Sequence, residues 1–226
     1  MNSKKTILFI VIAFFSGVLL FRWSGVLKSF HVESTSNEPN LKHGSRFLGS
    51  SLRKPERLDF VYFKFSDSLD AGGMTIVKRL IAIPGDTLEC KNGYYYINGN
   101  NIDEGIDLRF QYEMTTESFN ANVLGKVDNP EAYPRYNSET IIVFLDDSFV
   151  KNLPVKLERY SSSIRGNLSK EVFSNHIDWT VNNFGPVVLP EEKYFFSGDN
   201  RDNSYDSRWR GFVDEDNISG TLILQF

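Results

Sequence analysis

The chain is poor in the residues from which many hydrolase sites are built. Its 226 residues contain a single cysteine, Cys90, and three scattered histidines, His31, His43 and His176. One cysteine excludes an intrachain disulfide and a multi-cysteine metal site. The sequence also lacks the Gly-x-Ser-x-Gly and His-Glu-x-x-His motifs that mark many serine hydrolases and zinc proteases. If the chain is a hydrolase, we expect a group other than histidine to move the proton.

Positive charge is scarce outside the N-terminal region. Four of the 25 basic residues precede the first acidic residue, Glu33, so the rest of the chain carries 21 basic against 29 acidic residues, a net charge of −8. Binding to the phosphates of nucleic acids needs a cationic face. We therefore expect no nucleic-acid partner.

The longest apolar run lies at the N-terminus. It begins at Thr6, contains 16 uncharged residues rich in Ile, Leu, Phe and Val, and covers about 24 Å as a helix. Extension to Leu27, with Trp23 at the membrane surface, completes a span, so we expect a transmembrane anchor over residues 6–27. A cleavable signal peptide is the alternative, but no small-x-small exit follows the run. Two lysines before the run favour a single-pass topology in the cell membrane, with residues 1–5 cytoplasmic and the remainder outside.

The rest of the sequence is typical of short strands. Segments rich in β-branched and aromatic residues alternate with turn signals such as Pro84-Gly85-Asp86. Helical periodicity is weak outside the anchor, with two short candidates at 146–153 and 168–173. We therefore expect a mainly β protein with an antiparallel sheet as its core. The predicted strands are 58–65, 75–83, 93–97, 140–145, 187–189 and 221–226, and further strand-like pieces occupy 193–196 and 209–213.

One segment of twelve residues, Ser197–Arg208, is unusually polar. It holds three carboxylates, two guanidiniums, two amides and four hydroxyls. Because Arg201 and Arg208 are suited to paired hydrogen bonds with the aspartates of the segment, we expect a rigid, cross-braced loop of the kind that often carries function. An ordinary surface loop with ion pairs is the alternative. A calcium loop is disfavoured, because Ser207 and Val213 stand where the turn glycine and the bidentate glutamate belong.

A predicted strand, Thr75–Ile83, carries two adjacent cations. Alternation places Lys78 on one face and Arg79 on the other, so at least one of them points towards an apolar layer. A buried lysine can lose its proton because desolvation penalises the ammonium form. To act as a base near neutral pH, Lys78 would need its pKa to fall from about 10.4 to near 7. The alternative is a lysine on an edge strand with its amine in water.

Three segments share their order and composition with a known family. Residues 77–86 read Val-Lys-Arg-Leu-Ile-Ala-Ile-Pro-Gly-Asp, residues 184–190 read Phe-Gly-Pro-Val-Val-Leu-Pro, and residues 198–208 fit the pattern Gly-Asp-Asn-Arg-Asp-Asn-Ser-x-Asp-Ser-Arg at every specified position. These segments resemble the lysine box, the lead-in and the most distinctive box of the type I signal peptidases. That family consists of membrane serine proteases with a Ser/Lys dyad.

The family's serine box, Ser-Gly-Ser-Met-x-Pro-Thr-Leu, is matched only in part by residues 34–41, Ser-Thr-Ser-Asn-Glu-Pro-Asn-Leu. The shared positions make Ser36 the counterpart of the nucleophile and Ser34 the counterpart of the serine that helps the oxyanion hole. The differences are compatible with an altered specificity or with a weakened enzyme. A plain juxtamembrane linker is the alternative to a serine box. The chain departs from the family pattern at Thr35, Asn37 and Asn40.

The resemblance implies a serine endopeptidase that uses no metal and no cofactor. Neutral Lys78 would take the proton of Ser36, whose oxygen attacks a peptide carbonyl, while the Ser36 N–H and the Ser34 hydroxyl stabilise the oxyanion. Ser204 would orient the Lys78 amine. The implied partners are preprotein signal peptides with small residues before the cut, and the lipid bilayer. The residues expected to brace the loop of Ser204 are Asp199, Asp206 and Arg208.

The expected organisation is a cytoplasmic N-terminus (1–5), an anchor (6–27), a β-rich Ser/Lys peptidase core (28–103 and 184–226) and a smaller, cap-like α+β insertion (104–183). Two alternatives to a signal peptidase stay open. A peptidase specialised for conjugation or for a single cargo would keep the chemistry with a different groove, which the polar Asn37 favours. A noncatalytic membrane-anchored binding protein would keep the braced loop but would need neither Ser36 nor a neutral Lys78.

Overall fold

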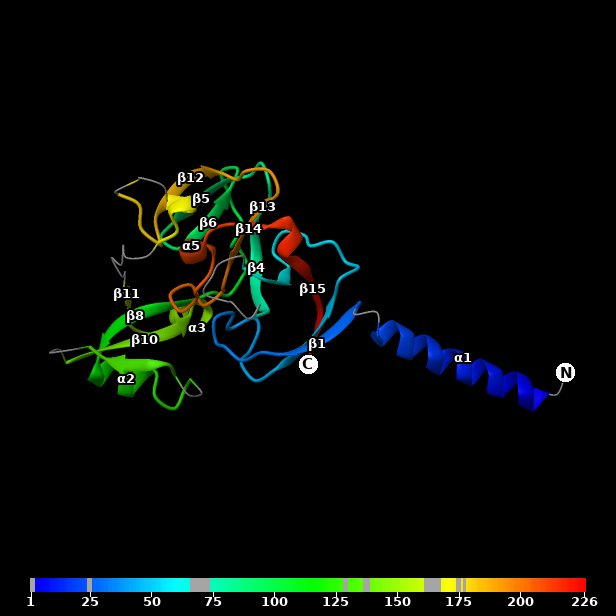
Figure 1. Ribbon diagram of the computed structural model, residues 1–226. Helices are drawn as coiled ribbons and strands as arrows, with labels where there is room; N and C mark the ends of the chain where they lie inside the picture. Colours follow the sequence, from blue (N-terminus) through cyan, green and yellow to red (C-terminus); the bar gives the residue numbers. More distant parts are fainter. Residues whose placement is uncertain are drawn as a thin grey trace.

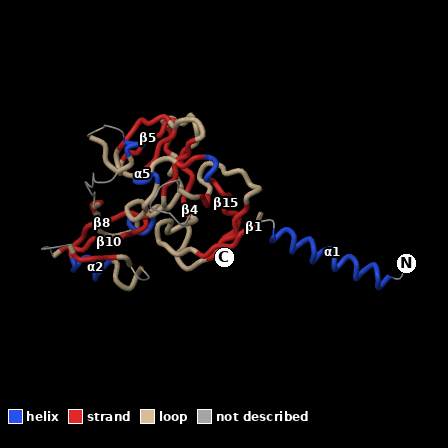
Figure 2. Tube along the Cα trace, in the orientation of Figure 1, coloured by secondary structure: helices blue, strands red, loops and turns tan. Residues whose placement is uncertain are grey.

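Antiparallel strands make up most of the fold, which confirms the expected mainly β class (Figure 1). The computed structural model describes residues 3–23, 26–65, 74–127, 130–135, 139–160, 168–173, 176 and 178–226. Within these residues the named strands form three sheets, and Figure 2 shows them gathered beyond the end of a long N-terminal helix. Each of the strands predicted above overlaps an observed one, although the piece at 209–213 does so only at Val213.

The largest sheet in the described part of the chain positions the lysine strand. Strand β3 pairs with residues 76–79 of β4, and β13 pairs with β4 at Arg79, Leu80 and Ala82. The two pairings therefore overlap at Arg79, and the residues that follow it, Leu80, Ile81 and Ala82, are fully buried. The order of this sheet is β1 (Leu27–His31), β2 (Arg46–Ser50), β15 (Ile218–Gln225), β3 (Phe60–Phe63), β4 (Ile76–Ala82), β13 (Lys193–Ser197) and β14 (Val213–Asp214).

Two smaller sheets flank the largest one (Figure 1). One has the order β12 (Phe184–Val188), β5 (Thr87–Lys91), β6 (Tyr94–Ile97) and β7 (Asn100–Asn101). The other has the order β11 (Glu158–Arg159), β8 (Arg109–Thr115), β10 (Thr140–Asp146) and β9 (Ala132–Pro134), and it is formed wholly within residues 104–183.

Apolar clusters pack within and between the sheets. Residues Phe110 and Val143 belong to the cluster of the β11-β8-β10-β9 sheet. A second cluster joins Tyr95 of β6 to Phe195 of β13, and it also takes in Val172 from helix α4 (Lys170–Phe173). The last part of the expected insertion thus packs against strands on either side of it in sequence.

The short helices agree in part with the sequence. Helix α3 (Asp147–Lys151) and helix α4 lie within the two predicted segments. The prediction of a strand-like piece at 209–213 is wrong for its first half, because Trp209 and Arg210 belong to helix α5 (Ser207–Arg210). The Asp206 side chain accepts the Arg208 N–H at the start of this helix, an N-cap that favours a helical turn there. Two further short helices are α2 (Thr116–Asn122) and the 3-10 helix η2 (Glu215–Asn217).

The N-terminal run forms helix α1 (Ser3–Trp23), which projects away from the sheets (Figure 1). The extension of this element to Leu27 is wrong, because Leu27 begins β1 and pairs with Ser50 of β2. Residues 1, 2, 24 and 25 of the expected N-terminus and anchor lie outside the described residues. In the part of the chain that the structure describes, no helix has both the length and the apolar character that crossing a membrane requires. The expected transmembrane helix is therefore not confirmed.

Candidate active site

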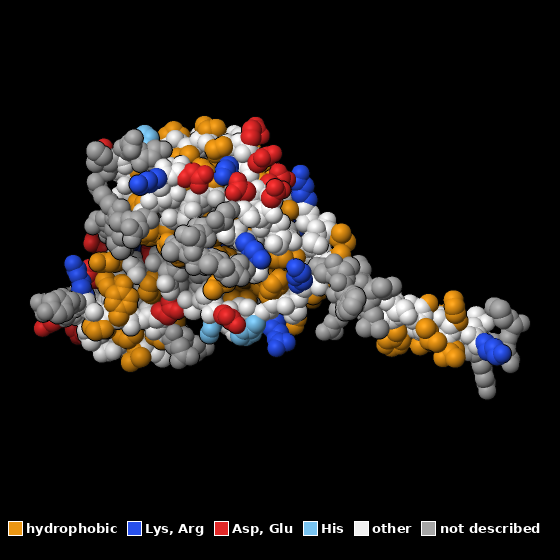
Figure 3. All heavy atoms as spheres, viewed as in Figure 1, with side chains coloured by type: hydrophobic (Ala, Val, Ile, Leu, Met, Phe, Trp, Pro, Cys, Tyr) orange, Lys and Arg blue, Asp and Glu red, His pale blue; other side chains and the backbone are white. Residues whose placement is uncertain are grey.

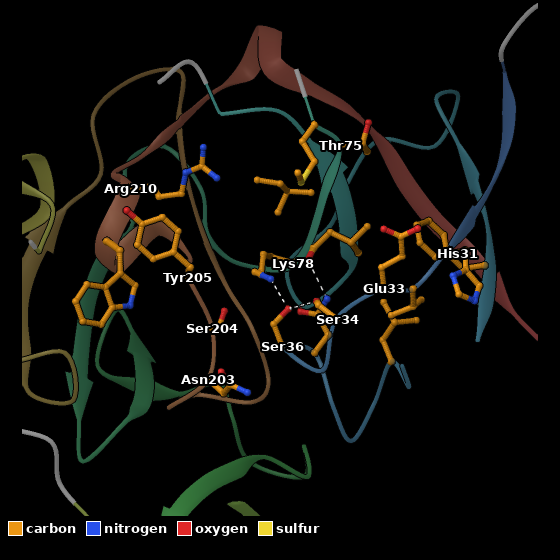
Figure 4. Close-up of a pocket in the computed structure, with 18 of the residues that line it drawn as sticks. His31, Glu33, Ser34, Ser36, Thr75, Lys78, Asn203, Ser204, Tyr205 and Arg210 are labelled. Carbon is orange, nitrogen blue, oxygen red and sulfur yellow. Dashed lines mark hydrogen bonds between the residues drawn. The ribbon is translucent and has the colours of Figure 1, made fainter. Parts of the chain in front are cut away.

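A cavity of about 920 Å³ holds the two residues predicted to form the dyad. The Nζ atom of Lys78 lies 2.5 Å from Oγ of Ser36, although the two residues are 42 positions apart. Figure 4 shows the Lys78 amine directed towards the Ser36 hydroxyl, with Ser34 next to it. The fold thus brings together a polar segment that follows β1 and a buried position in the middle of β4.

The two adjacent cations of β4 are both buried and have different partners. Lys78 is 5% exposed and meets Ser36, so the alternative of an amine in water is wrong. Arg79 is 9% exposed and donates from Nε and Nη2 to the two carboxylate oxygens of Asp199, at 2.7 and 2.5 Å. Its guanidinium also lies over the ring of Phe60. The alternation expected from the strand pattern is confirmed.

The segment that carries Ser36 is a tight turn fixed by a buried anchor. The Leu41 N–H donates to the Asn37 carbonyl at 3.0 Å, and the Leu41 side chain is fully buried against Phe47 and its neighbours. The carbonyl of Ser36 accepts the Asn200 N–H at 3.1 Å. A plain linker would not make such contacts, so the linker alternative is wrong.

Burial governs the charge of Lys78. Desolvation of its enclosed amine lowers the pKa from 10.5 to about 8. The carboxylates of Asp206 and Asp199 oppose this effect, whereas the guanidiniums of Arg208 and Arg210 add to it. With a pKa of about 8, roughly a tenth of the amines are neutral at pH 7 and able to accept a proton.

Ser34 and Ser204 line the same cavity, but they differ in their contacts. The Ser34 hydroxyl oxygen lies 3.0 Å from that of Ser36, and its part in binding an oxyanion stays a prediction. The Ser204 hydroxyl is buried and makes no hydrogen bond to the Lys78 amine; it interacts with the Asp206 carboxylate, whose pKa it helps to lower. The predicted bond from Ser204 to the Lys78 amine is therefore not seen, and its orienting role stays a prediction.

Glycine at position 198 permits the close approach of the two serine segments. A Cβ atom on Gly198 would overlap the carbonyl oxygen of Ser36 and the hydroxyl of Ser204, and it would lie 2.7 Å from Cβ of Ser204. Only a residue without a side chain fits between them. Sequence analysis placed Gly198 in the polar loop but did not assign it this role.

Asp206 and Arg208 brace the loop of Ser204 as expected. Both are buried, and the Arg208 Nε and Nη2 atoms donate to the two Asp206 carboxylate oxygens at 2.9 and 2.8 Å. Asp206 also accepts from the Ser197 hydroxyl and from the Gly198 N–H, each at 3.0 Å. Burial alone would raise the pKa of Asp206, but the charge and hydrogen bonds of Arg208 outweigh it and the pKa is lowered.

Two of the three remaining charges of the loop form ion pairs outside it, which sequence reasoning missed. Arg201 makes a two-pronged pair with the buried Asp103, with both distances 2.7 Å, and Asp199 pairs with Arg79. The signal for Arg79 was its place beside Lys78 in an apolar strand, since a buried guanidinium requires a partner. Asp103 lies two residues after β7 and carries no local signal of this kind.

Comparison with known proteins points to one family. Residues 3–226 match the sequence profile of a family described as "Signal peptidase, peptidase S26". A signal peptidase I of Aquifex aeolicus is 29% identical over 231 residues, which cover 99% of this chain and 83% of that protein. A probable signal peptidase I-2 of Synechocystis is 25% identical over 207 residues, and this chain spans 63% of its length, with 89% of this chain covered.

A solved structure of a signal peptidase I from Enterococcus faecalis is 23% identical with a TM-score of 0.37, and the match covers 76% of this chain and 98% of that one. The profile match is the decisive comparison, because it includes the Ser36 segment, β4 and the braced loop. Since it spans nearly the whole sequence, the chain belongs to the signal peptidase family, peptidase S26.

Proposed function

We propose that this protein is a signal peptidase I-type serine endopeptidase that removes signal peptides from exported preproteins. Ser36 is the nucleophile and Lys78 the general base. The observation that carries this proposal is the 2.5 Å separation of the Lys78 amine and the Ser36 hydroxyl inside a cavity that buries the amine. A desolvated amine next to a hydroxyl is a recognised way to activate a nucleophile without histidine.

The proposed reaction proceeds in two steps. Neutral Lys78 takes the proton of Ser36 as the serine oxygen attacks the scissile carbonyl, and the Ser36 N–H and Ser34 hydroxyl bind the resulting oxyanion. The lysine then passes its proton to the departing amine, which leaves an acyl ester on Ser36. A water molecule, deprotonated by Lys78, attacks the ester and releases the signal peptide. Ser204 orients the amine, and Asp199, Asp206 and Arg208 support it through the loop.

The shape of β4 supports an extended peptide as substrate. Strand β13 pairs with β4 from Arg79 onwards, and the first half of β4 lines the cavity through Ile76, Val77 and Lys78. An extended chain can bind along such a strand, with alternate side chains entering shallow pockets.

Helix α1 supports attachment to a membrane. Its described side chains from Ile7 to Phe15 are mostly apolar and strongly exposed, for example Phe9 at 72% (Figure 3). We propose that α1 anchors the protein in the cell membrane, with the N-terminus cytoplasmic and the cavity outside. We also propose that 28–103 and 184–226 form the catalytic core and that 104–183 are a cap-like insertion, which the separate sheet β11-β8-β10-β9 supports.

The proposal is tested by incubating the purified protein with a preprotein and sequencing the N-terminus of the product. We expect a single cut behind a small residue for the wild type, and loss of cleavage by at least 1,000-fold, a size typical of removing one member of such a dyad, for Ser36→Ala and for Lys78→Ala. The control is Lys151→Ala, which removes an exposed lysine on α3 and should cleave normally. Equal cleavage by the wild type and both dyad variants would refute the dyad, and a folded wild type without activity would favour a noncatalytic binding protein.

A further inference from the structure

The nucleophile segment is held in place by side chains at the positions where it departs from the family's serine box. Thr35 Oγ1 accepts from Nδ2 of Asn203 at 3.3 Å. Asn37 Nδ2 donates to the Val77 carbonyl at 2.8 Å. Asn40 Nδ2 donates to Oδ2 of Asp199 at 2.8 Å. None of the residues specified by the family pattern at these positions, Gly, Met and Thr, carries an amide that could make the last two bonds.

Asn37 directly follows the nucleophile, and its side chain is hydrogen-bonded to Val77, the residue directly before the base. It is 2% exposed, and its Nδ2 bond reaches Val77 in β4. The orientation of its amide is determined, because the flipped amide would set oxygen against the Val77 carbonyl oxygen. Its own Oδ1 is buried without a hydrogen-bond partner among the described residues, so the bond from Nδ2 is what the side chain contributes.

The direction of the Val77 carbonyl explains why a side chain takes this bond. The Leu80 N–H donates to the Asp59 carbonyl and the Leu80 carbonyl accepts the Leu58 N–H, so both groups point to the edge of β4 that faces β3. By alternation, the Val77 carbonyl points to the opposite edge, where β13 pairs with β4 only from Arg79 onwards. The Asn37 amide supplies the N–H that a neighbouring strand would otherwise provide.

Asn40 makes the corresponding link on the other side of the base. Besides Asp199, its Nδ2 donates to the Asp107 carbonyl at 2.7 Å. Asp199 is in turn held by the guanidinium of Arg79, the residue after Lys78. The two neighbours of Lys78 in β4 are therefore both tied to the nucleophile segment, one directly through Asn37 and the other through Asp199 and Asn40.

We propose that Asn37 and Asn40 are positioning residues that hold the Ser36 hydroxyl against the Lys78 amine. The need for them is physical: Ser36 lies in a turn outside the sheets, so its place relative to β4 depends on contacts across the cavity. A displacement of about 1 Å at a reacting atom can cost as much as 100-fold in rate. As a statement about catalysis, this inference rests on the proposed function, but the geometry that it describes can be tested without cleavage.

The test without cleavage uses a thiol in place of the nucleophile. In a Ser36→Cys background, a nearby lysine lowers the pKa of the introduced thiol, which is read from the pH dependence of its alkylation by iodoacetamide. The natural thiol does not interfere, because Cys90 is buried and desolvation raises its pKa to about 12. Adding Asn37→Leu should raise the pKa of the introduced thiol towards about 8.5, and Asn40→Leu should act in the same direction. Asn37→Gln, which keeps the amide, should restore the lower value.

The kinetic test uses the same substitutions with Ser36 intact. We expect Asn37→Leu and Asn40→Leu each to lower kcat about tenfold with KM within twofold, and Asn37→Gln to recover most of the loss. The control is Asn152→Leu, which removes an exposed amide at the C-terminal cap of α3 and should change neither constant. An unchanged thiol pKa in Asn37→Leu and Asn40→Leu, or a rise in KM with kcat unchanged, overturns the proposal. Inactivity of the wild type alongside the expected thiol shifts would instead refute the proposed function and leave the positioning role standing.

Discussion

Arg79 and Asp199 form a two-pronged ion pair that joins the lysine strand to the braced loop, with Nε–Oδ1 2.7 Å and Nη2–Oδ2 2.5 Å. The Asp199 side chain is fully buried, and that of Arg79 is 11% exposed. Because Arg79 directly follows Lys78 and Asp199 directly follows Gly198, this pair fixes the base relative to the loop that carries Ser204. Neither residue lines the cavity, but the Asp199 carboxylate raises the pKa of Lys78.

Removing Arg79 should destabilise the fold strongly. The substitution Arg79→Leu leaves the Asp199 carboxylate buried without its partner, which typically costs about 3–5 kcal/mol. Urea unfolding followed by fluorescence measures the change. The control is Arg53→Leu, whose pair with Asp59 is largely exposed at the arginine and should be worth less than about 1 kcal/mol. Adding Asp199→Leu to Arg79→Leu should recover much of the loss, and equal effects of the two arginine variants would contradict the prediction.

Activity should increase with pH up to about 8 and then level off. In the proposed mechanism the neutral form of Lys78 is the active one, and burial lowers its pKa to about 8. Below that value the neutral fraction falls tenfold for each pH unit, so kcat/KM should follow it with a slope of one. The profile is measured in buffers of constant ionic strength. A limb centred near pH 6 to 7, where histidine titrates, would contradict the assignment of Lys78 as the base.

The buried lysine should reduce stability in a pH-dependent manner. The folded protein holds the Lys78 proton less tightly than the unfolded chain, whose lysine has a pKa of 10.5. The unfolded state therefore binds more protons between pH 8 and 10.5, and stability rises with pH across that window. Lys78→Met removes the penalty and should be more stable than the wild type below pH 8 by roughly 3 kcal/mol. Urea midpoints at pH 7 and pH 10.5 measure this difference, and a gap that does not shrink at the higher pH would contradict the prediction.

A methyl group at position 198 should disrupt the site. Gly198→Ala would force the Ser36 carbonyl and the Ser204 side chain apart, because both lie inside the space that a Cβ atom needs. We expect a loss of kcat of at least about 100-fold and a destabilisation of roughly 1–3 kcal/mol. The matched control is Gly17→Ala on helix α1, where a Cβ atom meets nothing within 4 Å. Normal cleavage by Gly198→Ala would show that the two segments tolerate separation.

Much of the sheet structure follows from local pattern. The predicted strands 58–65 and 75–83 contain β3 and β4 because alternating aromatic and β-branched residues suit a pleated surface packed on a core. Strands β1 and β2 were missed, since Leu27–His31 and Arg46–Ser50 include polar residues and glycine. These strands are stabilised by pairing with distant partners rather than by propensity, and β2 pairs with β15 near the C-terminus.

The candidate site was likewise predictable where it depends on local sequence and not where it depends on contacts between distant segments. The segments of Lys78 and Ser204 were found from their residue patterns, whereas Ser36 was identified only by the resemblance of its segment to the family's serine box. The pairing of Arg201 was expected within the polar loop, but its partner is Asp103, almost a hundred positions away. Nothing in the neighbourhood of Asp103 marks it, because an ion pair between distant segments leaves no local pattern.

By itself, the sequence determined the chemical inventory and the periodicity: a β-rich chain, a lysine in an apolar strand, a polar loop and a serine segment. The tertiary structure decided that the Lys78 amine is buried and hydrogen-bonded to Ser36. It also decided that the Asn37 and Asn40 side chains make hydrogen bonds that hold the turn of Ser36 in place. The reason is that the desolvation of a group and its contacts depend on the segments that pack around it, and these segments are distant in sequence. Propensity and alternation act between neighbours, whereas this site is assembled from segments far apart in the chain.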